Sequence, residues 1–442
     1  MTMTEKRNEI EKLVRKALED NSEVTAWTLN TSETHRDELY LIGSETEQTR
    51  YVHELACVAS VLVDKTVDGT PMTGRVERTF TPEMSEKEVV NQIAEMVFAA
   101  SLALNPHFTL DEPRDNERTY PNQDHDIVYD RTAALQKLRD ETVNAVAKED
   151  GVRIASAEGF LTHNHIRETN SLGLTHEADT TRITYELVLL AGSGESEVES
   201  HLIRHERMLD KLELQETIGR YAQYARDNVN AELPKSGKAT IIFTEEALEH
   251  FFDYYQTKTM APVLYNKMSD WEVGQEVIET EEGDKITLSY DPELTGGLST
   301  CKYDGGGTLL EKFTFIKDGV FVKVVADKRH AGYMDVPTTG FATNMVIEPG
   351  TRSYEELLED DTYILSRFSS FTPNRFTGGF SGEIRNGLHY KDGKFTPVKG
   401  GSVSGKMQKT MRKVHLSKET CQFGRYFGPR YIKVYEVNIT GE

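Results

Sequence analysis

The segment 244–258 carries the densest set of side chains that could do chemistry. Glu246, His250 and Asp253 recur at steps of four and three, so on a helix they would project from one side, opposite an apolar stripe. Two carboxylates and an imidazole could hold a cation or move protons. The same pattern is typical of a solvated helix, where a Glu–His pair is worth only a few tenths of a kcal/mol, ~0.3. Both interpretations stay open.

Other histidines lack partners at metal-ligand spacing. His53 has no second histidine four residues later, so it does not form the pair typical of zinc peptidases. His163 and His165 share one face of a predicted strand, and His201 and His205 share one face of a predicted helix. None has an evident third ligand, so we expect all five to be structural or solvated.

Composition and motifs exclude several function classes. Lys plus Arg is 51 and Asp plus Glu is 73, giving a net charge of -22, which disfavours binding to nucleic acid or to anionic membranes. No Gly-x-Ser-x-Gly, Gly-x-Gly-x-x-Gly or Walker motif occurs. Three scattered cysteines, a polar start and no apolar run near the ~20 residues of a membrane span predict a cytoplasmic protein.

Hydrophobic periodicity predicts an α+β fold. We expect an N-terminal domain, 1–232, of helices packed on an antiparallel or mixed sheet, and a C-terminal β-rich domain, 238–442, that is barrel- or sandwich-like. The break between them is Pro-Lys-Ser-Gly at 234–237. The expected helices are 5–21, 85–105, 132–148, 199–230 and 245–258. The expected N-terminal strands are 23–29, 38–42, 51–63, 74–80, 152–168 and 174–190.

Ordered motifs along the chain resemble those of the TldD/PmbA family. The motifs are Asn-Ser-Leu-Gly at 170–173, Glu-Pro-Gly-Thr at 348–351 with a Ser-capped helix after it, Phe-Thr-Gly-Gly-Phe-Ser-Gly-Glu at 376–383 and Val-Lys-Gly-Gly-Ser-Val-Ser-Gly at 398–405. The resemblance is spread over most of the chain. It implies a cytoplasmic peptidase family of the TldD–TldE type, to which the phrase "modulator of DNA gyrase" is also attached.

The resemblance also implies where a metal site would lie. In the family, TldD-type subunits carry His-Glu-x-x-x-His and a later Cys as metal ligands, whereas TldE/PmbA-type subunits lack the motif. Here Glu245 stands in place of the first His, Glu246 in place of the general base, and His250 in place of the second His; Cys421 is the candidate sulfur ligand. With one imidazole replaced by a carboxylate, we expect metal affinity to be weak.

Three functions follow, in this order of preference. The first is a TldE/PmbA-like subunit without a catalytic metal or other cofactor, which dimerises with a TldD-type subunit bearing His-Glu-x-x-x-His, or with itself, and acts on unfolded peptides. The second is a self-sufficient zinc peptidase that uses Glu245, His250 and Cys421, with Glu246 polarising water. The third is a non-enzymatic peptide-binding protein.

Overall fold

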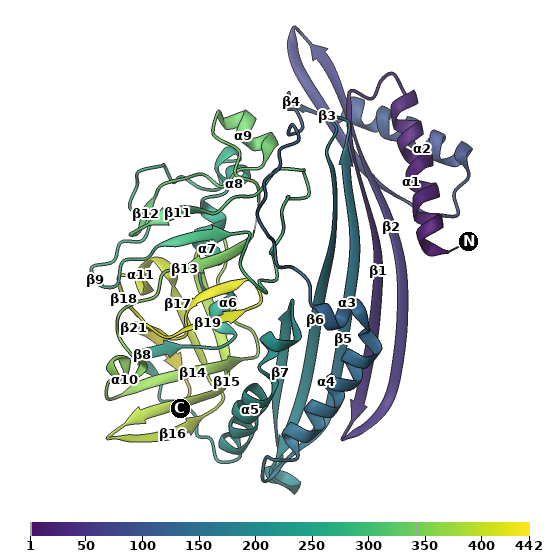
Figure 1. Ribbon diagram of the computed structural model, residues 1–442. Coiled ribbons are helices and arrows are strands. Elements are labelled where there is room, and N and C mark those ends of the chain that lie inside the picture. The colour runs from purple at the N-terminus through teal and green to yellow at the C-terminus, as the bar shows by residue number, and fades with distance from the viewer. Residues whose placement is uncertain (1, 342) are drawn as a thin grey trace.

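The computed structural model describes residues 2–341 and 343–442, and it confirms the α+β fold class. The chain builds three β-sheets: a seven-stranded sheet from the N-terminal half, and a six-stranded and an eight-stranded sheet from the C-terminal half. Figure 1 shows the long N-terminal strands standing beside the C-terminal strands, with α1 and α2 on the far side. In the described part of the chain, no helix has the length and apolarity needed to cross a membrane.

The N-terminal sheet is antiparallel throughout, in the order β4-β3-β2-β1-β5-β6-β7. Apolar and polar residues alternate along its central strands, so each strand presents one face to a core. The change from this sheet to the others falls between β7 and β8. The strands of the N-terminal sheet are β1 (Ala26–Ile42), β2 (Glu45–Val67), β3 (Thr70–Phe80), β4 (Leu104–Pro106), β5 (Val152–Asn170), β6 (Thr175–Ala191) and β7 (Val198–Glu206).

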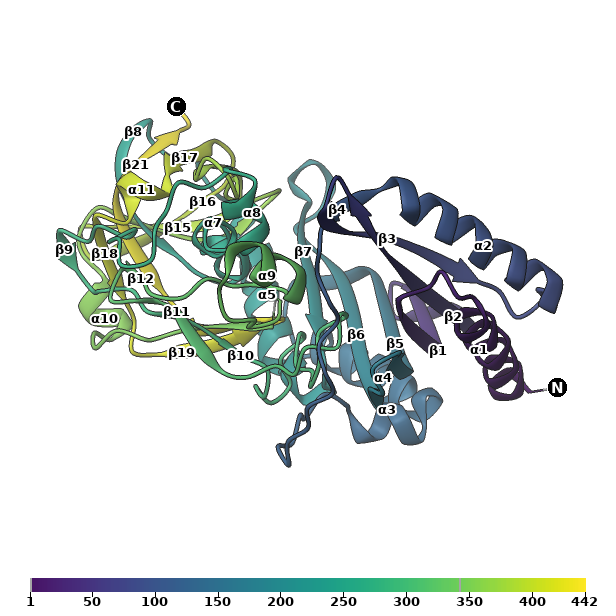
Figure 2. The ribbon, with the colours of Figure 1, turned by 90° about the horizontal axis from the view of Figure 1, so that it is seen from above.

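Helices cover one face of this sheet in two separate groups, as Figure 2 shows. One core joins α1 and α2 to β1 and β2, through residues such as Val14, Ile93 and Val61. A second core joins α4 and α5 to the other end of β1 and to β5 and β6, through residues such as Leu138 and Tyr185. The helices are α1 (Met3–Asp20), α2 (Glu86–Leu102), α3 (His125–Tyr129), α4 (Arg131–Val146) and α5 (Leu214–Asn228), with short 3₁₀ turns at Gly194–Ser196 and Leu209–Leu212.

The C-terminal half contains a closed ring of five strands. In pairing order the ring runs β15-β14-β8-β21-β17 and returns to β15, so its sheet has no free edge around the ring. β16, β18 and β9 extend this sheet outside the ring. The strands are β8 (Gly237–Phe243), β9 (Glu282–Gly283), β14 (Thr362–Phe368), β15 (Gly379–Lys391), β16 (Lys394–Val398), β17 (Ser402–Lys406), β18 (Lys413–Leu416) and β21 (Ile432–Thr440).

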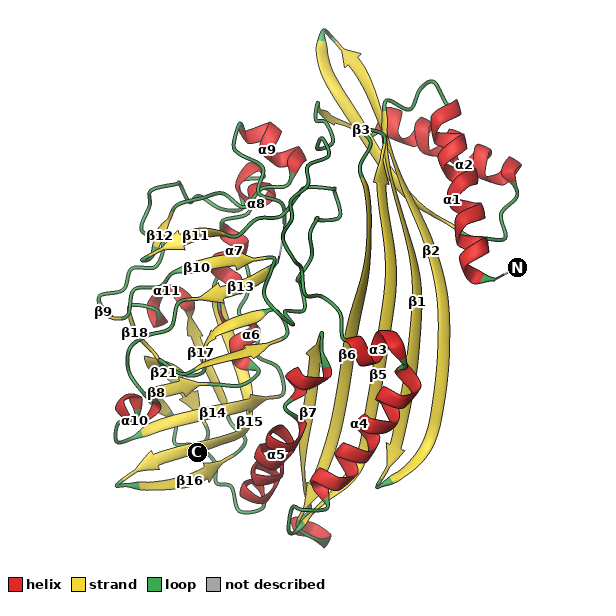
Figure 3. Cartoon of the chain, in the orientation of Figure 1, coloured by secondary structure: helices red, strands yellow, loops and turns green. Residues whose placement is uncertain are grey.

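A six-stranded sheet, ordered β12-β11-β10-β13-β20-β19, packs beside the ring (Figure 3). One large aromatic-rich core joins the two, and in it Phe243 of β8 contacts Phe251 and Phe371. The strands are β10 (Leu288–Asp291), β11 (Phe313–Lys317), β12 (Val320–Phe321), β13 (Asn344–Ile347), β19 (Thr420–Phe423) and β20 (Tyr426–Pro429). The helices of this half are α6 (Ala247–Phe251), α7 (Asp253–Lys258), α8 (Ala261–Tyr265), α9 (Lys328–Met334), α10 (Tyr354–Leu357) and α11 (Met407–Thr410).

Three sequence-based expectations about elements are wrong. The predicted helix 199–230 is strand β7 followed by a 3₁₀ turn and α5, because alternate residues of 198–206 are buried against β6. The predicted strands 23–29 and 38–42 belong to one long strand, β1. The predicted helix 245–258 is interrupted at Phe252, and α7 begins at Asp253.

Candidate functional site

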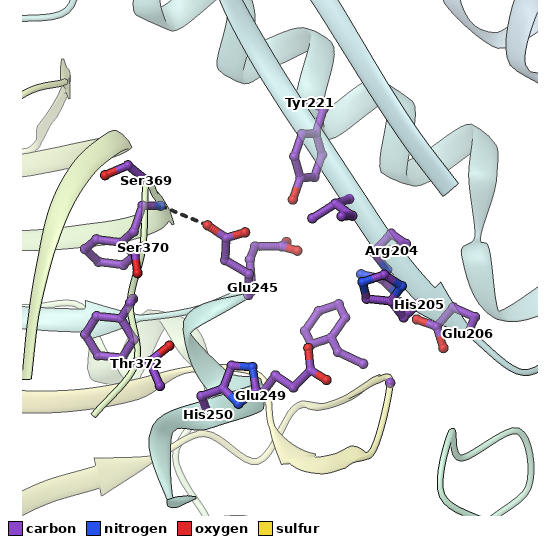
Figure 4. A pocket seen from close by; sticks show the side chains of 16 residues that line it. Arg204, His205, Glu206, Tyr221, Glu245, Glu249, His250, Ser369, Ser370 and Thr372 are labelled. Carbon is purple, nitrogen blue, oxygen red and sulfur yellow. Dashed lines mark hydrogen bonds and ion pairs between the residues drawn. The ribbon is translucent and has the colours of Figure 1, made fainter. Parts of the chain in front are cut away.

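A pocket of about 260 Å³ lies where the N-terminal sheet meets the C-terminal half. It is lined by residues 203–206 of β7, Tyr221 of α5, residues of the segment 245–250, residues 368–372 from the end of β14 onward, and residues 423–424 at the end of β19. Figure 4 shows Arg204, His205 and Glu206 facing the 245–250 segment from one side, and residues 369–372 facing it from the other. The pocket therefore joins elements from both halves of the chain.

Glu245 begins this segment in a strained conformation. Its φ of 57° lies in the left-handed region, which costs a non-glycine residue about 1 kcal/mol or more. The side chain is buried, and Arg220 of α5 places Nε 3.2 Å from Oε1. The other oxygen, Oε2, has no hydrogen-bond partner among the described residues. The first acidic position of the predicted site is thus already paired with a cation.

Glu246 is held by backbone and side chain together. The backbone N–H of Phe368 donates to Oε1 at 2.9 Å, and Nη1 of Arg367 donates to Oε2 at 2.7 Å. The same Arg367 also donates to the hydroxyl of Tyr221. Burial raises the pKa of Glu246, while the charge of Arg367 opposes that rise. The predicted general base is therefore fixed by its neighbours rather than free to approach a substrate water.

Glu206 and Arg204 of β7 add a third carboxylate–arginine pair to the pocket. Nη2 of Arg204 lies 2.9 Å from Oε1 of Glu206, and the Arg204 guanidinium stacks over Phe423 at 4.3 Å. Burial raises the pKa of Glu206 to about 7. Burial also lowers the pKa of the neighbouring His205, which favours its neutral form. His205 lines the pocket, and His201 lies on the same strand two positions before Ile203.

His250 is half-buried at the pocket wall, where its Nδ1 lies 3.1 Å from Oδ2 of Asp253. Asp253 is buried and also pairs with Arg375 at 3.0 Å and Arg425 at 2.6 Å. Burial acts to raise the pKa of Asp253, but the bond to His250 and the two arginines outweigh it and lower that pKa. The sequence placed Asp253 on a polar helix face with His250, but its arginine partners draw it into the core.

The predicted sulfur ligand is Cys421. It is buried on β19, with Sγ 3.9 Å from the carbonyl oxygen of Pro429, and it is not among the lining residues. Burial raises the pKa of its thiol to about 12.

The three predicted metal ligands do not come together in the described part of the chain. In the described ranges, 2–341 and 343–442, the one set of three His, Cys, Asp or Glu side chains whose ligand atoms all lie within 4.8 Å of one another is in the N-terminal sheet. Glu245, His250 and Cys421 do not form such a set. Glu245 and Glu246 pair instead with arginines. Sequence reasoning did not identify Arg204, Arg220 and Arg367, since only the fold brings them to these acids.

Comparison with known proteins places the C-terminal half in a family. Residues 236–441 match the model of the PmbA/TldA metallopeptidase C-terminal domain. Residues 236–441, the C-terminal half of the chain, therefore belong to this family. The matched range contains the pocket segment 245–250 and all strands of the closed ring.

Two curated proteins from Methanocaldococcus jannaschii are similar to parts of this chain. One, an uncharacterized protein, is 24% identical over 310 residues, covering 66% of this chain and 71% of its own length. The other, a metalloprotease, is 28% identical over 131 residues and is covered over only 27% of its length. Its activity is therefore not carried over to this chain by the match alone.

Solved structures show that the whole TldD/PmbA fold is shared. TldE from Thermococcus kodakarensis is 18% identical with a TM-score of 0.79, covering 99% of this chain and 100% of its own. A candidate modulator of a DNA gyrase from Thermotoga maritima is 18% identical with a TM-score of 0.78, at the same coverage of both chains. At 18% identity, the similarity to these two structures shows a shared fold and nothing further.

Proposed function

We propose that this chain is a TldE/PmbA-type subunit that has no catalytic metal and assembles with a TldD-type metallopeptidase subunit acting on unfolded peptides. The match of residues 236–441 to a metallopeptidase C-terminal domain supports the general role, and two similar proteins, a metalloprotease and a TldE, point to a peptidase complex. One observation carries the subunit assignment: Glu245 and Glu246 pair with Arg220 and Arg367 rather than standing open to a metal ion.

Charge explains why this pairing opposes metal binding. A buried carboxylate needs a compensating cation, which is either a metal ion or an arginine. Arg220 and Arg367 already supply it, and a divalent ion brought beside them would be repelled. In this proposal Glu246 positions residues 367–368 of β14 through its two hydrogen bonds, and it does not activate water.

The pocket also has the features needed to hold an extended peptide. β7 is the last strand of the N-terminal sheet, β19 is the last strand of the six-stranded sheet, and both line the pocket. An edge strand can receive a peptide through main-chain hydrogen bonds, while side-chain pockets select alternate residues. Ile203, which is 37% exposed and lines the pocket, offers an apolar contact for such a chain.

The first experiment measures metal content and partnership. The full chain is purified with a co-expressed homologue bearing His-Glu-x-x-x-His, and zinc is measured in the complex, in each subunit and in a His250→Ala variant. We expect a stable heterodimer, with metal in the partner and no His250-dependent metal in this chain. A zinc ion lost on His250→Ala would instead establish a self-sufficient peptidase. A homodimer that does not bind the partner would also overturn the proposal.

The second experiment measures digestion of a reduced, unfolded polypeptide by the partner, with and without this chain. We expect cleavage to require both subunits, and Ile203→Asp to slow it several-fold. Ile42→Asp is the matched control, because Ile42 is 62% exposed at the far end of β1. Protection of the polypeptide from cleavage would instead favour a peptide-binding protein that sequesters its ligand.

A further inference from the structure

A compact group of metal-ligand side chains lies in the N-terminal sheet, away from the pocket. Glu33 and His35 are two residues apart on β1, so they share a face, and His53 pairs directly with His35 across β1 and β2. This is the face that carries the helices. The group occupies the stretch of β1 between the part packed by α1 and α2 and the part packed by α4.

Three side chains converge on one point at this place. Nε2 of His53 lies 3.0 Å from Oε1 of Glu33, and Nε2 of His35 lies 3.4 Å from the same oxygen. The two imidazole rings are stacked, with centroids 3.9 Å apart and planes inclined by 28°. In the described part of the chain, this is the one set of three ligand-type side chains whose ligand atoms all lie within 4.8 Å of one another.

We propose that Glu33, His35 and His53 bind a divalent transition-metal ion of the zinc class. Two imidazole nitrogens and one carboxylate oxygen form a ligand set that zinc accepts, at bond lengths of ~2.0–2.2 Å. Ligand atoms on a tetrahedral ion at such bond lengths are ~3.3 Å apart, close to the separations of both imidazoles from Oε1. The side chains of His35 and His53 are each about one-third exposed, which leaves space for a water as the fourth ligand.

The surroundings of Glu33 hold its carboxylate in the required orientation. Thr4 donates to both carboxylate oxygens, at 3.1 Å to Oε2 and 3.3 Å to Oε1, and Nη1 of Arg7 lies 3.6 Å from Oε2. Oε1 is the oxygen that both histidines approach. Thr4 and Arg7 both come from α1. A second cation nearby, Arg131, is paired with Asp37 at 3.3 Å. Outer partners of this kind fix the orientation of metal ligands.

A further histidine pair extends the polar strip across the sheet. His163 of β5 pairs with His35 across β1 and β5, and its ring centroid lies 6.3 Å from that of His35. Both His163 and His165 contact Oδ1 of Asp179, at 2.8 and 3.2 Å. Because these two histidines share their own carboxylate, we assign the ion to Glu33, His35 and His53 alone.

This site is independent of the proposed subunit role. In the sheet order β2-β1-β5-β6-β7, three strand-to-strand steps separate β1 from the pocket strand β7. Glu33, His35 and His53 belong to the N-terminal half, outside the residues 236–441 that match the family model. A failure of one proposal therefore leaves the other standing, provided that the metal is assigned by variants.

The test titrates the chelator-treated full chain with zinc chloride by calorimetry, and with cobalt(II), whose visible absorption reports coordination. We expect one ion per chain, with affinity falling at least about 100-fold in His35→Gln and in His53→Gln, since even outer-shell changes cost 10–100-fold. His125→Gln is the matched control, because this histidine is 89% exposed elsewhere. The variant His250→Ala tests whether zinc binding depends on the pocket instead of this site.

Folding is checked in the same samples by thermal unfolding with and without zinc. We expect zinc to raise the melting temperature of the wild type and of His125→Gln, and to leave that of His53→Gln unchanged, while the metal-free proteins unfold alike. Absence of zinc binding by the wild type would overturn the proposal. So would binding that survives both His35→Gln and His53→Gln, or that is lost in His250→Ala.

Discussion

At the scale of single residues, the pocket is a place where carboxylates are buried and arginines compensate them. Glu206, Glu245 and Glu246 each have an arginine partner within 3.2 Å. The compensation is incomplete, since burial still raises the pKa of Glu206 and of Glu246. Incomplete compensation has a measurable consequence, because a raised pKa in the folded state makes stability depend on pH.

Glu206→Gln tests this consequence. The pKa of Glu206 is raised from 4.5 to about 7 by burial, so the folded state holds this proton more tightly than the unfolded state. The stabilisation from the proton is complete below pH ~4.5 and is lost as pH rises through ~7. Glutamine has no such proton. The free energy of unfolding of the variant, relative to wild type, should therefore rise by about 2 to 3 kcal/mol between pH 5 and pH 8.

Urea unfolding at both pH values measures this difference. Glu199→Gln on the same strand is the control, because this residue is exposed. Its free energy relative to wild type should change by less than about 0.5 kcal/mol over the same range. If Glu206→Gln behaves like Glu199→Gln, the carboxyl of Glu206 is ionised in the folded state and the burial argument is wrong.

At the scale of elements, local sequence signals predicted starts of helices well. The Ser-x-x-Glu capping boxes at Ser85 and Ser353 are both present, with reciprocal hydrogen bonds to Glu88 and Glu356. The hairpin of β5 and β6 also formed about its expected Asn-Gly turn. These signals succeed because each depends on atoms within a few residues.

Elements whose conformation depends on residues far away in the sequence were predicted poorly. The segment of β7 was predicted as a helix because its polar residues obscure a short alternation of apolar and polar side chains. Pairing with β6 decides its conformation. After the break at Phe252, Asp253 at the start of α7 pairs with Arg375 and Arg425, which are more than a hundred residues away in the sequence. For the same reason the acidic and histidine members of the pocket could be proposed from sequence, whereas their arginine partners could not.

Gly74→Ala tests how closely α2 packs on the sheet. Gly74 lies on β3, and a Cβ atom there would come 1.7 Å from the carbonyl oxygen of Ala100 in α2. Since backbone cannot yield as a flexible side chain does, α2 must lift from the core that holds Ile93 and Met96. We expect a loss of about 3 kcal/mol in the free energy of unfolding, at the upper end of overpacking effects.

Denaturant unfolding and hydrogen exchange in α2 would measure this loss. Gly332→Ala is the matched control, because Gly332 lies in α9 and a Cβ atom there has no neighbour within 4 Å. Alanine favours a helix over glycine, so this change should stabilise the protein by up to about 1 kcal/mol. Equal and small effects at both positions would mean that α2 sits less closely on β3 than the structure indicates.

At the scale of the whole molecule, the pocket exists because two sheets meet. β7 and α5 come from the N-terminal half, and the 245–250 segment comes from the C-terminal half. Arg367 joins them, since it contacts both Tyr221 and Glu246. Arg207 makes a second link by donating to the backbone of both Thr181 and Leu298. A pocket built across this junction needs both halves folded.

The net charge of -22 affects the stability of the whole molecule. Like charges on a compact chain repel, and this repulsion destabilises the folded state at low ionic strength. Exposed ion pairs such as Lys16–Glu86, with both side chains 59% exposed, contribute little in return, because solvent screens the two charges. Repulsion should therefore dominate the response to salt at a pH well above the isoelectric point.

We expect sodium chloride to raise the melting temperature at pH 8. Going from ~0.01 M to ~0.1 M salt shortens the screening length from about 30 Å to about 10 Å, which weakens long-range repulsion more than contacts between paired charges. A gain of about 1 kcal/mol corresponds to a rise of about 2 °C or less for a chain of this size. Near pH 5.1, the isoelectric point, the same salt step should leave the melting temperature unchanged or lower it, because only attractive pairs remain to be screened. A fall at pH 8 would mean that ion pairs, rather than net charge, control the stability of the molecule.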